Sequence, residues 1–273
     1  MVASDVCDNA TLGTATVVLF VASLVFLGFS IADRVRKDRE LAKYLTSAED
    51  ASSISNPNPS SKNNDRDVNP RFALTFLISF VAFVSYFMMW LSKGVSPTAS
   101  NSFIHSLLAK MDLSPVARYV DWLITTPLLL IDLLWYVTKK SRYDLVSVVV
   151  LDVIMIVLGG IAAFILRGFS RYFMWLLSTL AMLGIFAYLL YYRIVPASRD
   201  SSRGDESENK KREHAKYNKS MLWVLVLWSL YPIVWLLSPV GFGVLNGCAE
   251  TVIYAILDIV AKVGFGAFLL FVF

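Results

Sequence analysis

The chain has 273 residues, 56% of them hydrophobic, and a formal net charge of +4. A soluble domain averages roughly 45–50% apolar residues, so the composition argues against a soluble protein. The basic residues lie mainly in polar stretches between apolar runs, which accounts for the net charge. No nucleic-acid-binding motif is evident, so the sequence argues against a nucleic-acid partner.

The apolar residues gather in seven runs long enough to cross a membrane. About 20 such residues span the roughly 30 Å hydrocarbon core of a bilayer. The sequence therefore predicts an all-α membrane protein, one domain over 1–273 that forms a bundle of seven transmembrane helices in the lipid bilayer. No basic segment precedes the first run, so we expect no cleavable signal peptide. The spans are expected at about 14–32, 72–92, 117–138, 144–166, 170–193, 220–238 and 248–273.

Two polar stretches separate some of these runs and give the orientation. Residues 33–70 and 194–219 are rich in Ser, Asn, Asp and charged residues, and we expect both to be solvated loops, the first partly disordered. Nineteen of the 25 Lys and Arg residues lie on the side of the membrane that these stretches share. Because basic loops stay in the cytoplasm, we expect the N-terminus outside, the C-terminus inside, and the plasma membrane as the location.

Five ionisable residues lie deep inside the predicted spans: Asp121, Asp132, Asp152, Asp258 and Lys262. Such residues are costly in a membrane and usually functional. Lys262 is near the midpoint of the last span, too far from either end to reach the headgroups easily. A desolvated lysine amine suits covalent chemistry with an aldehyde. The alternative is that Lys262 only pairs with Asp258, one turn earlier.

The third span places several polar residues on one helix face. At about 100° per residue, Asp121, Thr125 and Asp132 share a face, and the two carboxyls are about 16 Å apart along the axis. Arg118 lies one turn before Asp121. Asp132 stands among leucines with no cation nearby in sequence, so we expect it to be protonated. This column of titratable groups indicates a transmembrane path, against the alternative of two unrelated core aspartates.

The sixth span carries an aromatic stripe at helical spacing, formed by Trp228, Tyr231 and Trp235 with Pro232 among them. Alone, such a stripe is more often lipid-facing or core packing. Beside a buried lysine it predicts one wall of a slot for a flat polyene. Pro232 is expected to kink the helix and free a backbone carbonyl.

Five segments carry a family resemblance: RYVDWLITTPLLLIDL (118–133), DVIM (152–155), RYFMWLLSTLAM (171–182), LWSLYPIVW (227–235) and LDIVAKVGFG (257–266). With them the chain resembles the microbial (type 1) rhodopsins, most closely the bacteriorhodopsin-like light-driven proton pumps, over all seven spans. The long first polar stretch departs from the archaeal pattern and hints at a eukaryotic member, fungal or algal.

The resemblance implies a light-driven outward proton pump, a transporter rather than an enzyme. Its cofactor would be all-trans retinal, held on Lys262 as a protonated Schiff base, with no metal. Asp121 would be the primary counter-ion and Asp258 the second counter-ion, hydrogen-bonded to Tyr86 and Tyr231. A possible homo-oligomer is left open.

The proton route is implied in the same way. Asp121 would accept the proton from the Schiff base, with Arg118 beside it and Thr125 hydrogen-bonded to it. Asp132, near Thr75 on the second helix, would donate the next proton, which the cytoplasm would replace.

The pocket residues follow from the same motifs. Trp122 and Trp228 would enclose the polyene, and Thr126 would hydrogen-bond Asp152, a link that is mainly architectural. The implied retinal pocket is Tyr86, Trp122, Thr126, Leu129, Met155, Gly159, Trp175, Ser178, Met182, Trp228, Tyr231, Pro232 and Trp235.

The exit side departs from the family pattern. Bacteriorhodopsin-type pumps hold a releasable proton between two outer glutamates. Glu250 matches one of them, but Val240 stands at the other position. We therefore expect the outer proton to be released late.

Two cysteines lie near the predicted outer surface. Cys7 precedes the first span, and Cys248 begins the last one. In the family's ring of helices the first and last are neighbours, so a disulfide between them is within reach on the oxidising side. Two unrelated cysteines remain the alternative.

Three other functional classes compete with the pump. A photosensor that signals to a partner is disfavoured by Asp132, because sensors commonly lack a carboxyl donor there. A light-gated channel needs a hydrated polar path, yet the first two spans carry no Glu or Lys. A retinal-free relative is disfavoured by Lys262.

Overall fold

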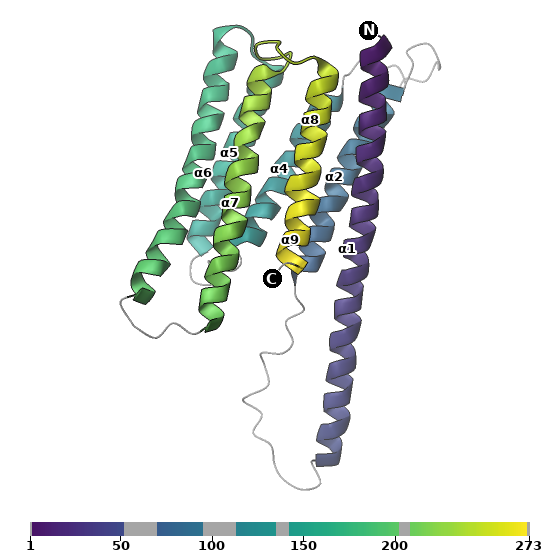
Figure 1. Ribbon diagram of the computed structural model, residues 1–273, viewed down its shortest axis with the longest axis vertical. Coiled ribbons are helices and arrows are strands. Elements are labelled where there is room, and N and C mark those ends of the chain that lie inside the picture. Colours follow the sequence, from purple (N-terminus) through teal and green to yellow (C-terminus); the bar gives the residue numbers. More distant parts are fainter. Residues whose placement is uncertain (1, 52–69, 95–112, 135–141, 202–207, 272–273) are drawn as a thin grey trace.

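The computed structural model describes residues 2–51, 70–94, 113–134, 142–201 and 208–271, and these ranges are almost entirely helical. They form seven rods, as predicted, with the last one divided into three consecutive segments (Figure 1). The elements are α1 (Val2–Ala51), α2 (Pro70–Gly94), α4 (Leu113–Leu134), α5 (Arg142–Phe164), α6 (Phe169–Ser201), α7 (Glu208–Leu237), α8 (Gly247–Ile259), the π-helix η2 (Val260–Gly264) and α9 (Phe265–Phe271).

The rods form a closed ring in chain order. Each helix packs against the next, and α8 packs against α1, so the first and last rods are neighbours. The two ends of the chain lie at opposite ends of the bundle (Figure 1). We call these the N-terminal end and the C-terminal end. Because α4 runs toward the C-terminal end, the column of charged residues along it crosses most of the bundle.

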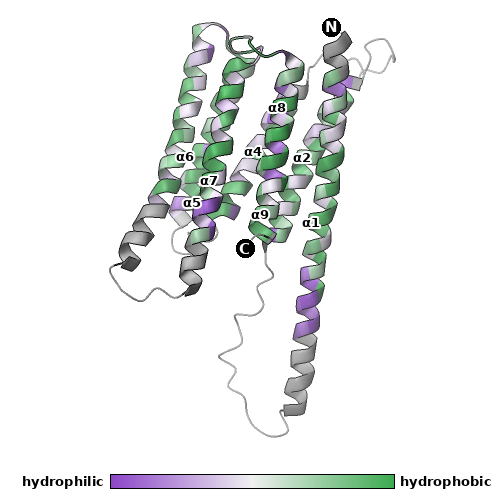
Figure 2. Ribbon diagram, in the orientation of Figure 1, coloured by the Kyte–Doolittle hydropathy of each residue, from purple (hydrophilic) through white to green (hydrophobic). Residues whose placement is uncertain are grey.

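Six of the described helices are long and apolar enough to cross a membrane. The remaining rod, α4, falls short of that standard, and it carries Arg118, Asp121 and Asp132 within 22 residues. Apolar residues dominate most of the ribbon (Figure 2).

Burial in this bundle reverses the pattern of a soluble protein. Large apolar side chains point outward, such as Val17 at 62% exposed and Leu222 at 58%. Charged residues lie inside instead: Asp121 and Asp258 are fully buried. This arrangement suits a lipid surround, where inward-facing ionisable groups mark a functional path.

The first polar stretch was predicted to be a loop, but its first half is helical. Helix α1 continues without a break to Ala51 and extends past the other helices (Figure 1), and the part of it just beyond the apolar run is hydrophilic (Figure 2). This segment contains no Gly or Pro after Gly28 and is rich in Arg, Lys, Glu, Leu and Ala, which favour helix. Asp33 also pairs with Arg36 and Lys37 one turn ahead. Polarity was therefore mistaken for loop structure; residues 52–69 lie outside the described ranges.

The second polar stretch is also largely helical, against the prediction of a loop over 194–219. Helix α6 continues to Ser201, and α7 begins at Glu208 with a run of Glu, Lys, Arg and Ala. These residues are good helix formers that happen to be polar. The predicted span ends at 135–138 and 272–273 lie outside the described residues.

Candidate functional site

Lys262 lies in the widened turn of the last rod. Lys262 belongs to the π-helix η2, which lies between α8 and α9. Single π-turns inside α-helices frequently occur at functional sites. Lys262 is 1% exposed, and an ammonium group buried to that extent requires partners of opposite charge.

Two carboxylates provide those partners. Lys262 Nζ forms a hydrogen bond and ion pair with Asp121 Oδ2 on α4. The same nitrogen is 3.3 Å from Asp258 Oδ1, one turn earlier on its own rod. The third and last rods thus meet at one buried cation between two buried carboxyl groups.

Asp258 is held by three donors. The hydroxyl of Tyr86 donates to Oδ2 at 2.7 Å, and the hydroxyl of Tyr231 donates to Oδ1 at 2.9 Å. Trp122 Nε1 also donates to Oδ1, at 3.0 Å. Both carboxylate oxygens of the buried Asp258 therefore have hydrogen-bond donors from other helices.

Asp121 has fewer hydrogen bonds than Asp258. Its Oδ1 has no hydrogen-bond partner among the described residues. Thr125 does bond to Asp121, but through the backbone carbonyl at 2.8 Å. The threonine hydroxyl reaches back one turn along its own helix, a common alternative for this side chain. One oxygen of Asp121 is therefore left able to accept a proton.

Asp152 is linked to the third rod. Thr126 Oγ1 donates to Asp152 Oδ2 at 2.8 Å, and the same hydroxyl is 2.7 Å from the carbonyl of Trp122. This contact joins α4 to α5 beside the cavity. It gives the buried Asp152 a partner.

A cavity lies beside Lys262, and its walls are mostly aromatic and apolar. All the predicted pocket residues except Tyr86 line it, and Tyr86 lies behind Asp258 as one of its donors. The lining is Tyr119, Trp122, Thr126, Leu129, Met155, Ile156, Gly159, Trp175, Ser178, Thr179, Met182, Trp228, Tyr231, Pro232, Trp235, Tyr254, Asp258, Ala261 and Lys262.

The end of the cavity near α5, α6 and α7 is fixed by polar contacts to backbone. Trp175 Nε1 donates to the carbonyl of Pro232 at 3.2 Å, and Ser178 Oγ donates to the carbonyl of Met155 at 2.7 Å. The rings of Trp175 and Trp235 stack with centroids 6.3 Å apart. These contacts hold the large side chains in place and satisfy the polar groups of Trp175 and Ser178.

Toward the N-terminal end, Arg118 is the next charged group on α4. It is buried, with Nη1 3.6 Å from Glu250 Oε1 and its guanidinium 4.5 Å from the centre of the Tyr254 ring. The loop after α7 carries Val240, whose backbone carbonyl accepts from Arg171 Nη1 at 2.7 Å. Val240, which stands where related pumps carry the second glutamate, is thus hydrogen-bonded to α6 through its backbone carbonyl.

Toward the C-terminal end, Asp132 has a cationic neighbour that the sequence did not reveal. Arg71 Nε is 3.7 Å from Asp132 Oδ1, and Arg71 Nη2 donates to the backbone carbonyl of Asp132 at 3.3 Å. Asp132 has no cation nearby in sequence, as stated above, but the fold brings one to it from another helix. Arg71 falls between the predicted polar stretch and the predicted second span, but it lies in the first turn of α2 and is 5% exposed.

Thr75 lies one turn beyond Arg71 on α2 and is fully enclosed. Its hydroxyl has no hydrogen-bond partner among the described residues. The methyl carbon Cγ2 faces Gly266 on α9 so closely that a Cβ on that glycine would be 2.3 Å away. Only a glycine permits this approach between α2 and α9.

The model of the bacteriorhodopsin-like protein family matches residues 60–273. The chain belongs to this family. It is 34% identical to archaerhodopsin-3 of Halorubrum sodomense over 206 residues, which are 76% of this chain and 73% of that protein. Bacteriorhodopsin of Halobacterium salinarum is 34% identical over 210 residues, 76% of this chain and 72% of that protein. The thermophilic rhodopsin of Rubrobacter xylanophilus has a similar structure, with a TM-score of 0.68 at 25% identity over 96% of this chain and 94% of that one.

The predicted resemblance and the seven-helix fold are thereby confirmed. Membership implies an integral membrane protein that crosses the bilayer several times, and it implies a retinal chromophore. The residues present fit such a group. Lys262 offers a buried primary amine at the cavity wall, Asp121 and Asp258 compensate a cation at its nitrogen, and most of the remaining lining is aromatic or aliphatic.

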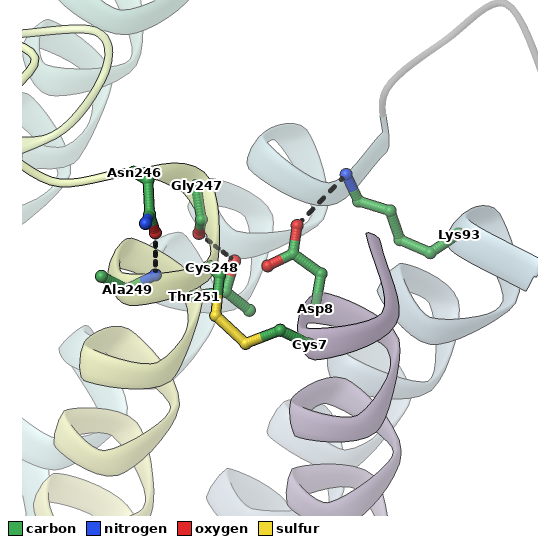
Figure 3. Close-up of a disulfide and its surroundings, with 8 residues drawn as sticks. All are labelled: Cys7, Asp8, Lys93, Asn246, Gly247, Cys248, Ala249 and Thr251. Carbon is green, nitrogen blue, oxygen red and sulfur yellow. Dashed lines mark hydrogen bonds and ion pairs between the residues drawn. A yellow bond between two sulfur atoms is a disulfide. The ribbon is translucent and has the colours of Figure 1, made fainter. Parts of the chain in front are cut away.

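At the N-terminal end of this rhodopsin, the first and last rods are joined. Cys7 and Cys248 form a disulfide with Cα atoms 5.8 Å apart (Figure 3). Cys7 lies within α1 rather than before it. Next to the disulfide, Lys93 of α2 is 3.9 Å from Asp8 Oδ2 (Figure 3). These two links connect three helix ends close to Glu250.

Sequence reasoning missed several functional side chains. Tyr254 and Tyr119 line the cavity, and Tyr254 could have been found because it precedes Asp258 by one turn and Lys262 by two. Ile156, Thr179 and Ala261 neighbour predicted pocket residues in sequence. The hydrogen bond from Trp122 to Asp258 and the contact of Arg71 with Asp132 join different helices, and spacing along one helix does not predict them.

Proposed function

We propose that this rhodopsin is a light-driven pump that moves protons out of the cytoplasm across the plasma membrane. The whole chain would serve as one retinal-binding domain, with all-trans retinal attached at Lys262 Nζ. When bound, retinal supplies light absorption and an isomerisation that displaces the lysine nitrogen. The residues of the chain would do the rest: hold a proton, accept it and replace it.

The observation that supports this most strongly is the difference between the two carboxyl groups at Lys262. Asp258 accepts three hydrogen bonds, and these stabilise its anion. Asp121 bonds to Lys262 and keeps Oδ1 without a partner among the described residues. We therefore infer that the proton leaves Lys262 Nζ for Asp121, while Asp258 remains charged and fixes the lysine's position.

The direction follows from what lies on each side of this pair. Beyond Asp121, toward the N-terminal end, Arg118 pairs with Glu250. Toward the C-terminal end, Asp132 is about 16 Å along α4. With the N-terminal end outside, as the basic-residue count predicts, a proton would leave past Arg118 and Glu250. Asp132 would return a proton to Lys262.

A polar stripe on α2 supports the return route. Arg71, Thr75, Ser79 and Tyr86 follow one another at spacings that keep them on one helix face, and all four are buried. Tyr86 bonds to Asp258 beside Lys262, and Arg71 contacts Asp132. The stripe thus joins the two sites that would exchange the proton.

The test is a light-induced pH change in cells that express the protein and are supplied with all-trans retinal. We expect the medium to acidify in light and the change to vanish with a protonophore. Current at zero voltage and without ion gradients would distinguish the pump from a channel, which needs a gradient. Alkalinisation of the medium, or no light-dependent pH change in cells that contain the pigment, would contradict the proposal.

A further inference from the structure

Arg71 and Asp132 form a buried ion pair at the C-terminal end of the bundle, where α2 begins and α4 nears its end. Their side chains are 6% and 1% exposed, and Arg71 Nε lies 3.7 Å from Asp132 Oδ1. Arg71 Nη2 also bonds to the backbone carbonyl of Asp132. The arginine is therefore anchored to the backbone of the residue whose carboxyl group it faces.

Other titratable groups lie on the helices that pack against α4, and several of them have partners of their own. On α5, Asp152 bonds to Thr126 and Asp144 accepts from Tyr188. On α7, the hydroxyl of Tyr217 donates to the carbonyl of Leu189. The same helix carries Lys216, which is half-buried, and Lys219, which is exposed. Arg71 is therefore the charged group recorded at the carboxyl of Asp132 within the described residues.

An arginine in this position cannot be neutralised by losing a proton, because guanidinium stays charged in proteins. A positive charge about 4 Å away favours the anionic form of a carboxyl group, most strongly where water is scarce. The 3.7 Å separation makes an ion pair without a direct hydrogen bond from Nε, and Asp132 Oδ1 accepts no hydrogen bond among the described residues. That oxygen can therefore still take up a proton.

We propose that Arg71 is a positioning residue that keeps Asp132 ionised in the dark, so that Asp132 relays a proton instead of storing one. This deepens the proposed function and rests on it. Asp132 would first take a proton from cytoplasmic water, forming an O–H bond. That bond then breaks as the proton moves on to Lys262 Nζ, and the Arg71–Asp132 ion pair forms again. Uptake would precede the return of the proton to Lys262.

The first test reads the charge of Asp132 directly in the dark and needs no pumping. The protein is labelled with ¹³C at aspartate carboxyl carbons, and the Asp132 resonance is identified by its loss in Asp132→Asn. We expect the chemical shift of a carboxylate at neutral pH, and the shift of a protonated acid in Arg71→Met. Arg71→Lys, which keeps the charge, should retain the carboxylate.

The second test follows the kinetics. Time-resolved visible absorption measures how fast the proton returns to Lys262 between pH 6 and 8. In the native chain the rate should fall about tenfold for each unit of rising pH, because uptake from water limits it. In Arg71→Met the rate should be nearly independent of pH, since Asp132 already carries its proton. Arg71→Lys should behave like the native chain.

Arg34→Met is the matched control for loss of one positive charge. Arg34 is exposed on α1, and it lies slightly more than one turn beyond Phe29, whose ring stacks on Phe72, next to Arg71. The substitution Arg34→Met thus removes a cation near the same end of the bundle without changing a contact of Asp132. It should leave both the resonance and the pH dependence unchanged.

Two outcomes overturn the inference. One is a protonated Asp132 in the native dark protein. The other is a return rate that does not depend on pH in the native chain. Either could occur in a protein that pumps normally, so the proposed function would survive. Conversely, absence of light-driven acidification would refute the pump, while the resonance of Asp132 would still decide the role of Arg71.

Discussion

Replacing Gly266 by alanine tests the close approach of α2 and α9 that encloses the site. A Cβ at this position would lie 2.3 Å from Thr75 Cγ2, about 1 Å inside an ordinary contact. Thr75 is β-branched and buried, so its side chain has little freedom to turn away. Such overpacking typically costs about 1–3 kcal/mol, and the strain would fall one turn after Lys262.

The assay is the rate at which the pigment loses its visible band at a fixed elevated temperature. Each 1.4 kcal/mol corresponds to about a tenfold change, so Gly266→Ala should bleach roughly 5- to 100-fold faster. Gly28→Ala is the matched control, because a Cβ there meets nothing within 4 Å. Alanine is also the better helix former, so this variant should bleach no faster than the native protein.

A second substitution identifies the atom responsible. Serine lacks the methyl carbon that meets the new Cβ, so Thr75→Ser combined with Gly266→Ala should recover most of the lost stability. The reasoning is refuted if Gly266→Ala is as stable as Gly28→Ala, or if the serine gives no recovery while the single variant is strongly destabilised.

Four further predictions concern the chromophore, the acceptor, the exit and the disulfide. Lys262→Ala should form no visible band with retinal, and a retained band would place the attachment elsewhere. Asp121→Asn should shift the band to longer wavelength and stop pumping, since an anion beside the lysine nitrogen is lost; light-driven acidification in this variant would exclude Asp121 as acceptor. With Val240 in place of a second glutamate, a pH-sensitive dye should report release after uptake, and release coincident with protonation of Asp121 would show that Glu250 suffices. Denatured, unreduced protein should contain no free thiol, whereas two would rule out the bond from Cys7.

The parts of the fold that could be predicted are those that depend only on the hydropathy of each single helix. The seven apolar runs could be placed because a bilayer demands about 20 such residues, and Lys262 stood out because charge is rare there. The hydrophilic extensions of α1, α6 and α7 were missed, because a solvated helix and a loop share a polar composition. Helix propensity distinguishes a solvated helix from a loop, because Gly and Pro disfavour helix and residues 33–51 contain neither.

The candidate site was predictable along each helix and less so between helices. The 3.6-residue period brings Asp121, Thr125 and Asp132 to one face of α4, and it brings Asp258 to Lys262. It does not say which groups on α2 face them. Arg71 stands at a helix start, where its sequence context is that of a polar stretch, yet α2 turns it toward α4. Only packing could reveal that Asp132 has a cationic neighbour.

Three groups of paired charges lie along the proposed proton path. Arg118 with Glu250 is formally neutral, as is Arg71 with Asp132, while Lys262 with Asp121 and Asp258 carries one excess negative charge. A proton that moves from Lys262 to Asp121 stays within the central group and leaves its charge unchanged. Any step that takes the proton out of that group must pass an arginine, whose positive charge opposes it. In the proposed pump, the two arginines would therefore act as electrostatic barriers at either end of the path, so that proton release past Arg118 and proton uptake past Arg71 would each work against a positive charge.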